Sequence, residues 1–113
     1  MKIIIAYIRP ENLNKVKQEL AKVQVFKMSV TNALGCGEEP GFHESYRGVG
    51  FEVDLLKKVR LEIGINNDFV QPTIEAIVAG AKTGKVGDGK IFIVPLEECV
   101  RIRTAEKGGA AIG

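Results

Sequence analysis

The order in which two kinds of hydrophobic repeat follow one another constrains the fold of this 113-residue chain more than any other feature. A β-branched run over residues 3–9 predicts a buried strand, which Pro10 ends. The next apolar residues recur every three or four positions and predict a helix with Asn12 as its N-cap; they are Leu13, Val16, Leu20 and Val23. Residues 28–34 predict a second strand.

The second half of the chain repeats this order. Residues 57–65 alternate strictly, with Val59, Leu61, Ile63 and Ile65 on one face and Lys58, Arg60, Glu62 and Gly64 on the other. Residues 66–68 carry capping signals for a second helix, whose apolar face is predicted to hold Val70, Ile74, Ile77, Val78 and Ala81. A glycine-rich loop at 83–90, a buried strand at 91–96 and a short extended piece at 100–103 follow.

The predicted order is β-α-β, a long loop, then β-α-β. This order is typical of a ferredoxin-like α+β fold, with an antiparallel sheet and both helices on one face. The length of the chain predicts one domain over residues 1–113. The connecting stretch at 35–54 is rich in glycine and has little apolar periodicity, so it is predicted to be a long functional loop.

Charge and composition exclude several classes of function. A net charge of +2 demands no nucleic acid partner, and the apolar run at the N-terminus is too short for a membrane span. Cys36 and Cys99 are expected to be free thiols of a cytoplasmic protein. The chain has one histidine, no Ser/His/Asp set and no close carboxylate pair, which argues against a catalytic function.

The segment from Thr83 to Lys90 is the strongest chemical signal. Three glycines within it let backbone N–H groups approach an anion, and Lys85 and Lys90 add positive charge. An ordinary helix-to-strand turn is the alternative explanation of these glycines. The segment also resembles a P-loop, but Ile91 stands where the Mg²⁺-binding hydroxyl belongs, and the loop follows a helix instead of opening one.

Two further groups of residues suggest binding. Arg101 and Arg103 would lie on one face of an extended strand, which suits a polyphosphate, although a solvated edge strand would look the same. Phe42, Tyr46 and Phe51 fall in the long loop, where they would dock on a partner or form a small cluster of their own.

Taken together, these motifs resemble those of the PII signal-transduction proteins, the nitrogen-status regulators of bacteria, archaea and plastids. The resemblance covers essentially the whole chain. It is carried by Thr83-x-x-x-Gly87-Asp88-Gly89-Lys90-Ile91-Phe92, by Arg101-Ile102-Arg103-Thr104 and by Tyr46-Arg47-Gly48.

The resemblance implies a non-enzymatic homotrimer in which ATP and ADP compete for three clefts between subunits. The implied nucleotide-binding residues are Ser29, Gly35, Gly37, Glu62, Gly64, Gly87, Asp88, Gly89, Lys90, Arg101 and Arg103. Bound Mg²⁺, held with ATP by Glu39, would recruit 2-oxoglutarate, whose implied contacts are Arg9, Glu39, Gly41, Lys58 and Gly87.

The same resemblance divides the chain into a T-loop at about 37–55, a B-loop at 82–90 and a C-loop at 101–109. The T-loop would dock on an ammonium transporter or on another enzyme or regulator of nitrogen metabolism. The implied docking residues are Phe42, Tyr46, Arg47 and Phe51. No nucleic acid partner and no direct membrane insertion are implied.

Three positions depart from the family pattern. Phe51 stands where uridylylated members have a tyrosine, so no modification is expected there, and Val49 lacks a hydroxyl that some members phosphorylate. Glu39 replaces a glutamine; it is a good Mg²⁺ ligand but sets like charge beside a dianion, at a cost of about 1 kcal/mol near a dielectric of 80 and about 4 kcal/mol near 20.

Three alternatives stay open at this point. A PII-like protein with a different effector would keep the nucleotide loop and lose 2-oxoglutarate. An RNA-binding RRM shares the element order, but only Phe51 of its stacking aromatics is present. A nucleotide-consuming enzyme would need more acids than Asp88 beside the phosphates.

Overall fold

An antiparallel sheet backed by two helices positions most of the candidate site residues that the structure describes. The structure is a computed structural model and describes residues 1–35, 42–45 and 52–113. Its elements, in chain order, are β1 (Lys2–Ile8), a 3₁₀ turn η1 (Pro10–Asn12), α1 (Leu13–Lys22), β2 (Ser29–Gly35), β3 (Phe42–Ser45), β4 (Glu52–Ile65), a 3₁₀ turn η2 (Asn67–Phe69), α2 (Val70–Ala81), β5 (Gly89–Pro95) and α3 (Gly109–Ile112).

The sheet has the strand order β2-β4-β1-β5, and all neighbouring strands run antiparallel. Ile4 on β1 lies opposite Ile63 on β4 and Ile93 on β5, which fixes the register of the three strands. β3 pairs with the first residues of β4, off the main path. This order confirms the predicted α+β, ferredoxin-like fold.

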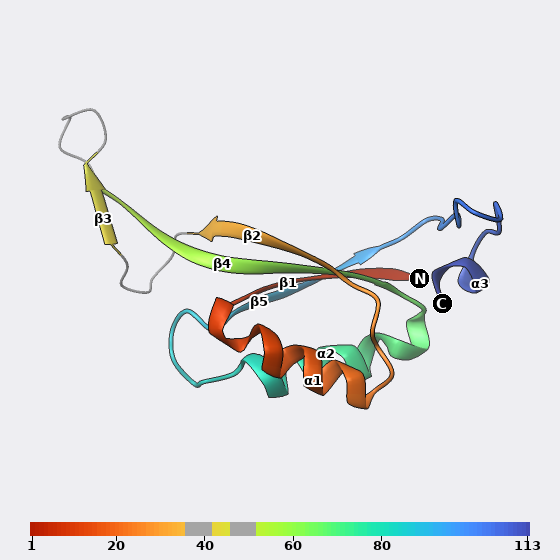
Figure 1. The fold of residues 1–113 in the computed structure, drawn as a ribbon, viewed down its shortest axis with the longest axis horizontal. Helices are drawn as coiled ribbons and strands as arrows, with labels where there is room; N and C mark the ends of the chain where they lie inside the picture. Colours follow the sequence, from red (N-terminus) through yellow and green to blue (C-terminus); the bar gives the residue numbers. More distant parts are fainter. Residues whose placement is uncertain (36–41, 46–51) are drawn as a thin grey trace.

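The core lies between one face of the sheet and the two helices, as Figure 1 shows. The predicted alternation is confirmed on β4, where the four apolar side chains from Val59 to Ile65 are buried. They pack with Ile4, Ala6 and Ile8 of β1, Val16 and Leu20 of α1, and Ala76, Ile77 and Ala81 of α2. The helices approach closely because a Cβ at Gly80 would lie 2.6 Å from Cα of Val16.

Two predictions about the helices are refined by the structure. Asn12 is the N-cap residue of α1, as predicted, but its side chain makes no capping hydrogen bond. Its Nδ2 instead donates to the carbonyl oxygen of Ala81, at 3.3 Å. Val78 is 44% exposed, while Thr73 is fully buried in its place. The buried face of α2 is formed mostly by small residues, which let the helix approach the sheet. Val78 lies outside this face.

Two predictions about the strands also need correction. The expected loop at 35–54 contains β3, and β4 begins at Glu52, so pairing between strands continues well before the visible alternation at 57. The strand at 91–96 is not buried: Phe92 is 50% exposed and Ile93 43%. β5 pairs only with β1, so it is an edge strand of the single chain.

Candidate functional site

Asp88 closes the glycine-rich loop between α2 and β5. Its Oδ2 accepts hydrogen bonds from the backbone N–H groups of Thr83, at 2.7 Å, and Gly84, at 2.8 Å. Its Oδ1 accepts a further bond from the Thr83 hydroxyl. The hydrogen bond from the Thr83 hydroxyl, followed by those from the backbone, holds the pKa of the Asp88 carboxyl far below its usual range. Asp88 therefore stays ionised and fixes the loop from within.

Two basic side chains brace the other side of the same loop. Arg9, just after β1, donates from Nη2 to the carbonyl oxygen of Val86 at 2.7 Å, and its Nε lies 3.3 Å from Oδ1 of Asp88. Lys58, on β4, donates to the carbonyl oxygen of Gly87 at 2.7 Å. The structure thus brings together three of the residues that the sequence assigned to 2-oxoglutarate: Arg9, Lys58 and Gly87.

Gly89 makes the transition from the loop into β5. Its φ is +111°, and a Cβ there would lie 1.7 Å from the carbonyl oxygen of Tyr7 on the neighbouring strand. Only glycine fits so close to a paired backbone. This transition makes Lys90 the second residue of β5, where it lies opposite Tyr7 with its side chain exposed.

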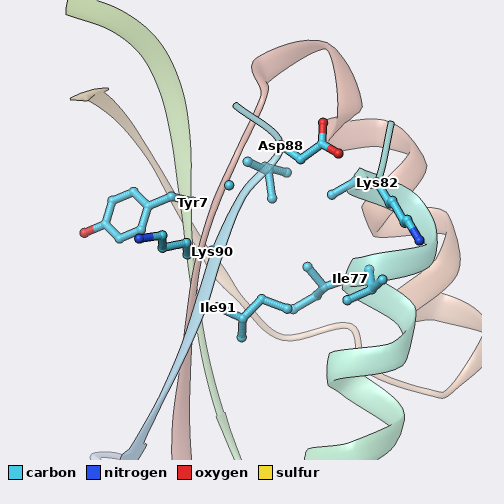
Figure 2. Close-up of a pocket in the computed structure, with 10 residues that line it drawn as sticks. Tyr7, Ile77, Lys82, Asp88, Lys90 and Ile91 are labelled. Carbon is cyan, nitrogen blue, oxygen red and sulfur yellow. The ribbon is translucent and has the colours of Figure 1, made fainter. Parts of the chain in front are cut away.

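A pocket of about 280 Å³ lies between this end of β5 and the last turn of α2. Its walls are mostly apolar and include Ile77 and Ile91, while Asp88 and Lys82 lie toward its upper end in Figure 2. Lys90 extends beside Tyr7, on the side away from α2 (Figure 2). Such a pocket suits an apolar side chain or ring better than a phosphate.

The sheet face opposite the helices carries the remaining predicted residues of β2 and β4. Ser29 lies opposite Glu62 in the register. Lys58, Glu62 and Gly64 share this face because side chains two residues apart on a strand point the same way. Gly35 lies at the end of β2, where a Cβ would be 3.6 Å from Cγ of Lys58.

Arg60 belongs to this face but was not among the predicted site residues. Its Nη1 lies 2.8 Å from Oε2 of Glu62. Hydrogen bonds with Glu62 and then Tyr7 raise the pKa of the Arg60 guanidinium. The signal was present in the sequence, because a cation and an acid two residues apart on a strand are neighbours on one face.

Arg101 and Arg103 do not lie on an extended strand, so that prediction is wrong. Residues 102–104 form a turn, which the hydrogen bond from the N–H of Ala105 to the Arg101 carbonyl closes at 2.7 Å. The Arg101 side chain is partly buried and its Nη1 lies 3.0 Å from Oε1 of Glu106, whereas Ile102 is 100% exposed. The chain turns at 102–104 where a strand would have continued the alternation, and Ala105, with a φ of +60°, follows this turn.

The arginines and the glycine-rich loop lie at opposite ends of β5 (Figure 1). Lys90 stands at the start of this strand, while Arg101 and Arg103 follow after its end at Pro95. The strand alone separates them by roughly 20 Å at about 3.3 Å per residue. One chain therefore does not bring the two halves of the predicted nucleotide site together.

Several predicted residues lie outside the part of the chain that the structure describes: Gly37, Glu39, Gly41, Tyr46, Arg47 and Phe51. The backbone of Phe42 belongs to β3, but its side chain is also outside the description. None of the helices in the described ranges is long and apolar enough to cross a membrane.

Comparison with known proteins now identifies the family. A family model described as nitrogen regulatory protein P-II matches residues 1–106. Nitrogen regulatory protein GlnK1 of Methanosarcina mazei is 49% identical, over 99% of this chain and 97% of that protein. Nitrogen regulatory protein P-II of Azospirillum brasilense is also 49% identical, over 99% of this chain and 100% of that protein. Nitrogen regulatory protein P-II 2 of Methanothermobacter thermautotrophicus is 47% identical, over 99% and 97%.

The chain belongs to the P-II family of nitrogen regulatory proteins, which confirms the family predicted from the sequence. The names of the family and of these relatives describe regulators, so the chain has a regulatory role in nitrogen metabolism.

Proposed function

We propose that this chain is a non-enzymatic signal-transduction regulator that binds ATP and ADP competitively at clefts between the subunits of a homotrimer. The observation that carries the proposal is the separation of Lys90 from Arg101 and Arg103 along β5. A second copy that sets its arginines beside the glycine-rich loop of the first would complete a phosphate site. Membership of a regulatory family supports a signalling role for that site.

The phosphates would lie against the start of β5. Gly87, with a φ of +103°, places no side chain between the loop backbone and the phosphates. Gly89 lets β5 begin directly against Tyr7, beside the phosphates. Lys90 would supply a mobile charge, and the arginines of the neighbouring copy would supply planar donors that match phosphate oxygens. Asp88 would support this site by holding the loop, since its oxygens already accept bonds from Thr83 and Gly84.

The adenine and ribose would lie along β2 and β4, on the face opposite the helices. Ser29 and Glu62 are cross-strand neighbours there, and Gly64 exposes backbone on the same face. Gly35 pairs with Leu56, six residues along β4 from Glu62, or roughly 20 Å at about 3.3 Å per residue. Gly35 and Gly37 would therefore approach the ligand from the neighbouring copy. The Arg60 guanidinium holds the Glu62 carboxylate at 2.8 Å and would set its orientation.

An apolar strip on this same face supports the homotrimer. Phe92 is 50% exposed and Val94 is 40% exposed on β5, and the register places them opposite Ile5 and Ile3. A contiguous apolar surface of this kind usually marks an interface. Two further copies around a threefold axis would bury the strip in each subunit.

The second effector would be 2-oxoglutarate, bound beside Arg9, Lys58 and Gly87. Two cations within hydrogen-bond reach of one loop fit a dicarboxylate. Mg²⁺, held by Glu39 together with ATP, would supply a further positive charge, and Gly41 would lie nearby. An adenylate sensor that lacks 2-oxoglutarate is the second candidate, because Glu39 sets negative charge beside the dianion.

Signalling would follow from a shift in population. ATP and ADP differ in charge and so would favour different conformations of the T-loop at about 37–55. One conformation would dock on an ammonium transporter or another nitrogen-metabolism target in the cytoplasm, through Phe42, Tyr46, Arg47 and Phe51. Phe51 has no hydroxyl to modify, so control would come from metabolites.

Isothermal titration calorimetry tests this proposal. ATP and ADP are titrated into the protein with Mg²⁺, with and without 2-oxoglutarate. We expect binding of both nucleotides, loss of affinity in Lys90→Gln, and little change in Lys85→Gln, a matched charge removal in the same loop. Tighter ATP binding with 2-oxoglutarate would support the dual sensor, and unchanged binding would support the adenylate sensor. Absence of ATP binding would refute the proposal.

A further inference from the structure

Residues 109–113, here called the C-terminal flap, fold back onto the body of the chain. Side chains from three separate connecting segments hold its backbone carbonyl oxygens. The contacts run from Asn66 Nδ2 to Gly109 at 3.1 Å, from Arg101 Nη2 to Ala110 at 3.0 Å and Gly113 at 3.4 Å, and from Lys27 Nζ to Gly113 at 2.8 Å. The flap is therefore fixed by donors that lie outside it.

The apolar contact of the flap falls on the sheet face of the proposed nucleotide site. Cδ1 of Ile112 would lie 3.4 Å from a Cβ at Gly64, so this side chain sits against the exposed backbone of β4. A pocket of about 170 Å³ adjoins it, lined by Phe26, which is 64% exposed, and Phe69, which is 44% exposed.

The flap has little stability of its own. Its helix, α3, spans only Gly109–Ile112, and a helix of four residues is not stable in water without tertiary contacts. Two of the residues within it are alanines, which bring no anchoring side chain. Its position therefore depends on the donors Asn66, Arg101 and Lys27, and Arg101 provides two of their hydrogen bonds.

Arg101 is also a residue that the proposed function assigns to the phosphates. In this structure its Nη1 bonds Glu106 and its Nη2 bonds the flap. A paired grip on phosphate oxygens requires two parallel N–H donors of the same guanidinium. Arg101 cannot give this grip and keep the flap in place.

We propose that the C-terminal flap is a latch that a nucleotide polyphosphate releases by taking Arg101. The inference rests on the proposed function and adds a regulatory step to it. In the latched conformation the flap holds Arg101 back and sets Ile112 against Gly64. When a phosphate takes Arg101, the flap loses two anchors and leaves the β4 surface. The apparent affinity for nucleotide is then reduced by the fraction of molecules that are latched.

Hydrogen exchange and calorimetry on the same samples test the latch. Exchange of the amides at 109–113 is measured without ligand and with saturating ATP and Mg²⁺. A Lys27→Met variant removes one anchor without touching Arg101. Lys22→Met is its control, because Lys22 donates to Glu19 within α1 and not to the flap. We expect faster exchange at 109–113 with ATP, and ATP binding roughly three- to tenfold tighter in Lys27→Met than in the wild type or the control.

The outcomes separate the two proposals. If ATP binds while exchange at 109–113 stays unchanged or slows, and Lys27→Met binds like the wild type, the latch is wrong and the nucleotide site stands. If calorimetry detects no ATP binding, both proposals fail.

Discussion

Replacing Gly89 with alanine tests how much stability depends on the close contact between the start of β5 and the backbone of β1. At this position a Cβ would lie 1.7 Å from the Tyr7 carbonyl oxygen, whereas real Cβ contacts are not found below 3.0 Å. The two strands would have to separate there by roughly 1.3 Å. Forcing a side chain into a filled site costs about 1–3 kcal/mol. The left-handed φ of +111° adds about 1–2 kcal/mol for an L-residue.

Gly84→Ala provides the matched control. Its φ of +86° imposes a similar backbone cost, but nothing lies within 4 Å of the added Cβ. In both variants alanine also reduces the conformational entropy of the unfolded chain, which offsets about 0.4–1 kcal/mol of the lost stability. Urea denaturation should therefore show a loss of about 1 kcal/mol for Gly84→Ala and about 3 kcal/mol for Gly89→Ala. Equal losses would refute the steric reasoning.

Three further predictions concern charge, core and assembly. Asp88→Asn should lower the melting temperature at pH 7. The ionised Asp88 stabilises the fold fully above its usual pKa of 3.8 and loses this effect progressively as the pH falls toward its depressed pKa in the folded protein, so the difference from wild type should shrink below about pH 4. A difference independent of pH would contradict this. Ile77→Ala, which truncates a side chain 1% exposed, should cost about 2–5 kcal/mol in urea denaturation. Phe92→Glu should prevent trimer formation in light scattering after gel filtration, whereas Phe26→Glu, at another exposed phenylalanine, should not; a trimeric Phe92→Glu would place the interface elsewhere.

The sequence allowed the fold to be predicted because its periodicities are regular where the core is regular. The alternation from Val59 to Ile65 and the spacing of Val16 and Leu20 correspond to the buried faces. The same reasoning failed where the alternation is interrupted. Backbone pairing with β3 and β2 extends β4 back to Glu52. Val53 and Leu55 are in phase with the run from Val59 to Ile65, but Leu56 and Lys57 break the alternation between them.

The sequence suggests which residues form the candidate site, but it shows only part of how they are arranged in space. The pattern of Gly87, Gly89 and Lys90 marks the loop, since glycine spacing records where backbone must turn. The contacts that shape the loop link residues far apart in sequence, such as Arg9 with Asp88, and no local pattern shows them. The turn at 102–104 was missed because a positive φ at Ala105 has no sequence signature.

A mixed-subunit experiment tests most directly whether the nucleotide clefts are shared between copies. Lys90→Gln and Arg103→Gln each remove one side of the proposed cleft, and calorimetry should detect little ATP binding by either variant alone. The two variants are co-expressed in equal amounts so that they form mixed trimers. Each cleft takes Lys90 from one subunit and Arg103 from the next, and each of these is intact in half of the subunits, so about a quarter of the clefts have both. The account predicts ATP binding at wild-type affinity with about a quarter of the wild-type stoichiometry. Mixed trimers that bind no more ATP than the separate variants would contradict it.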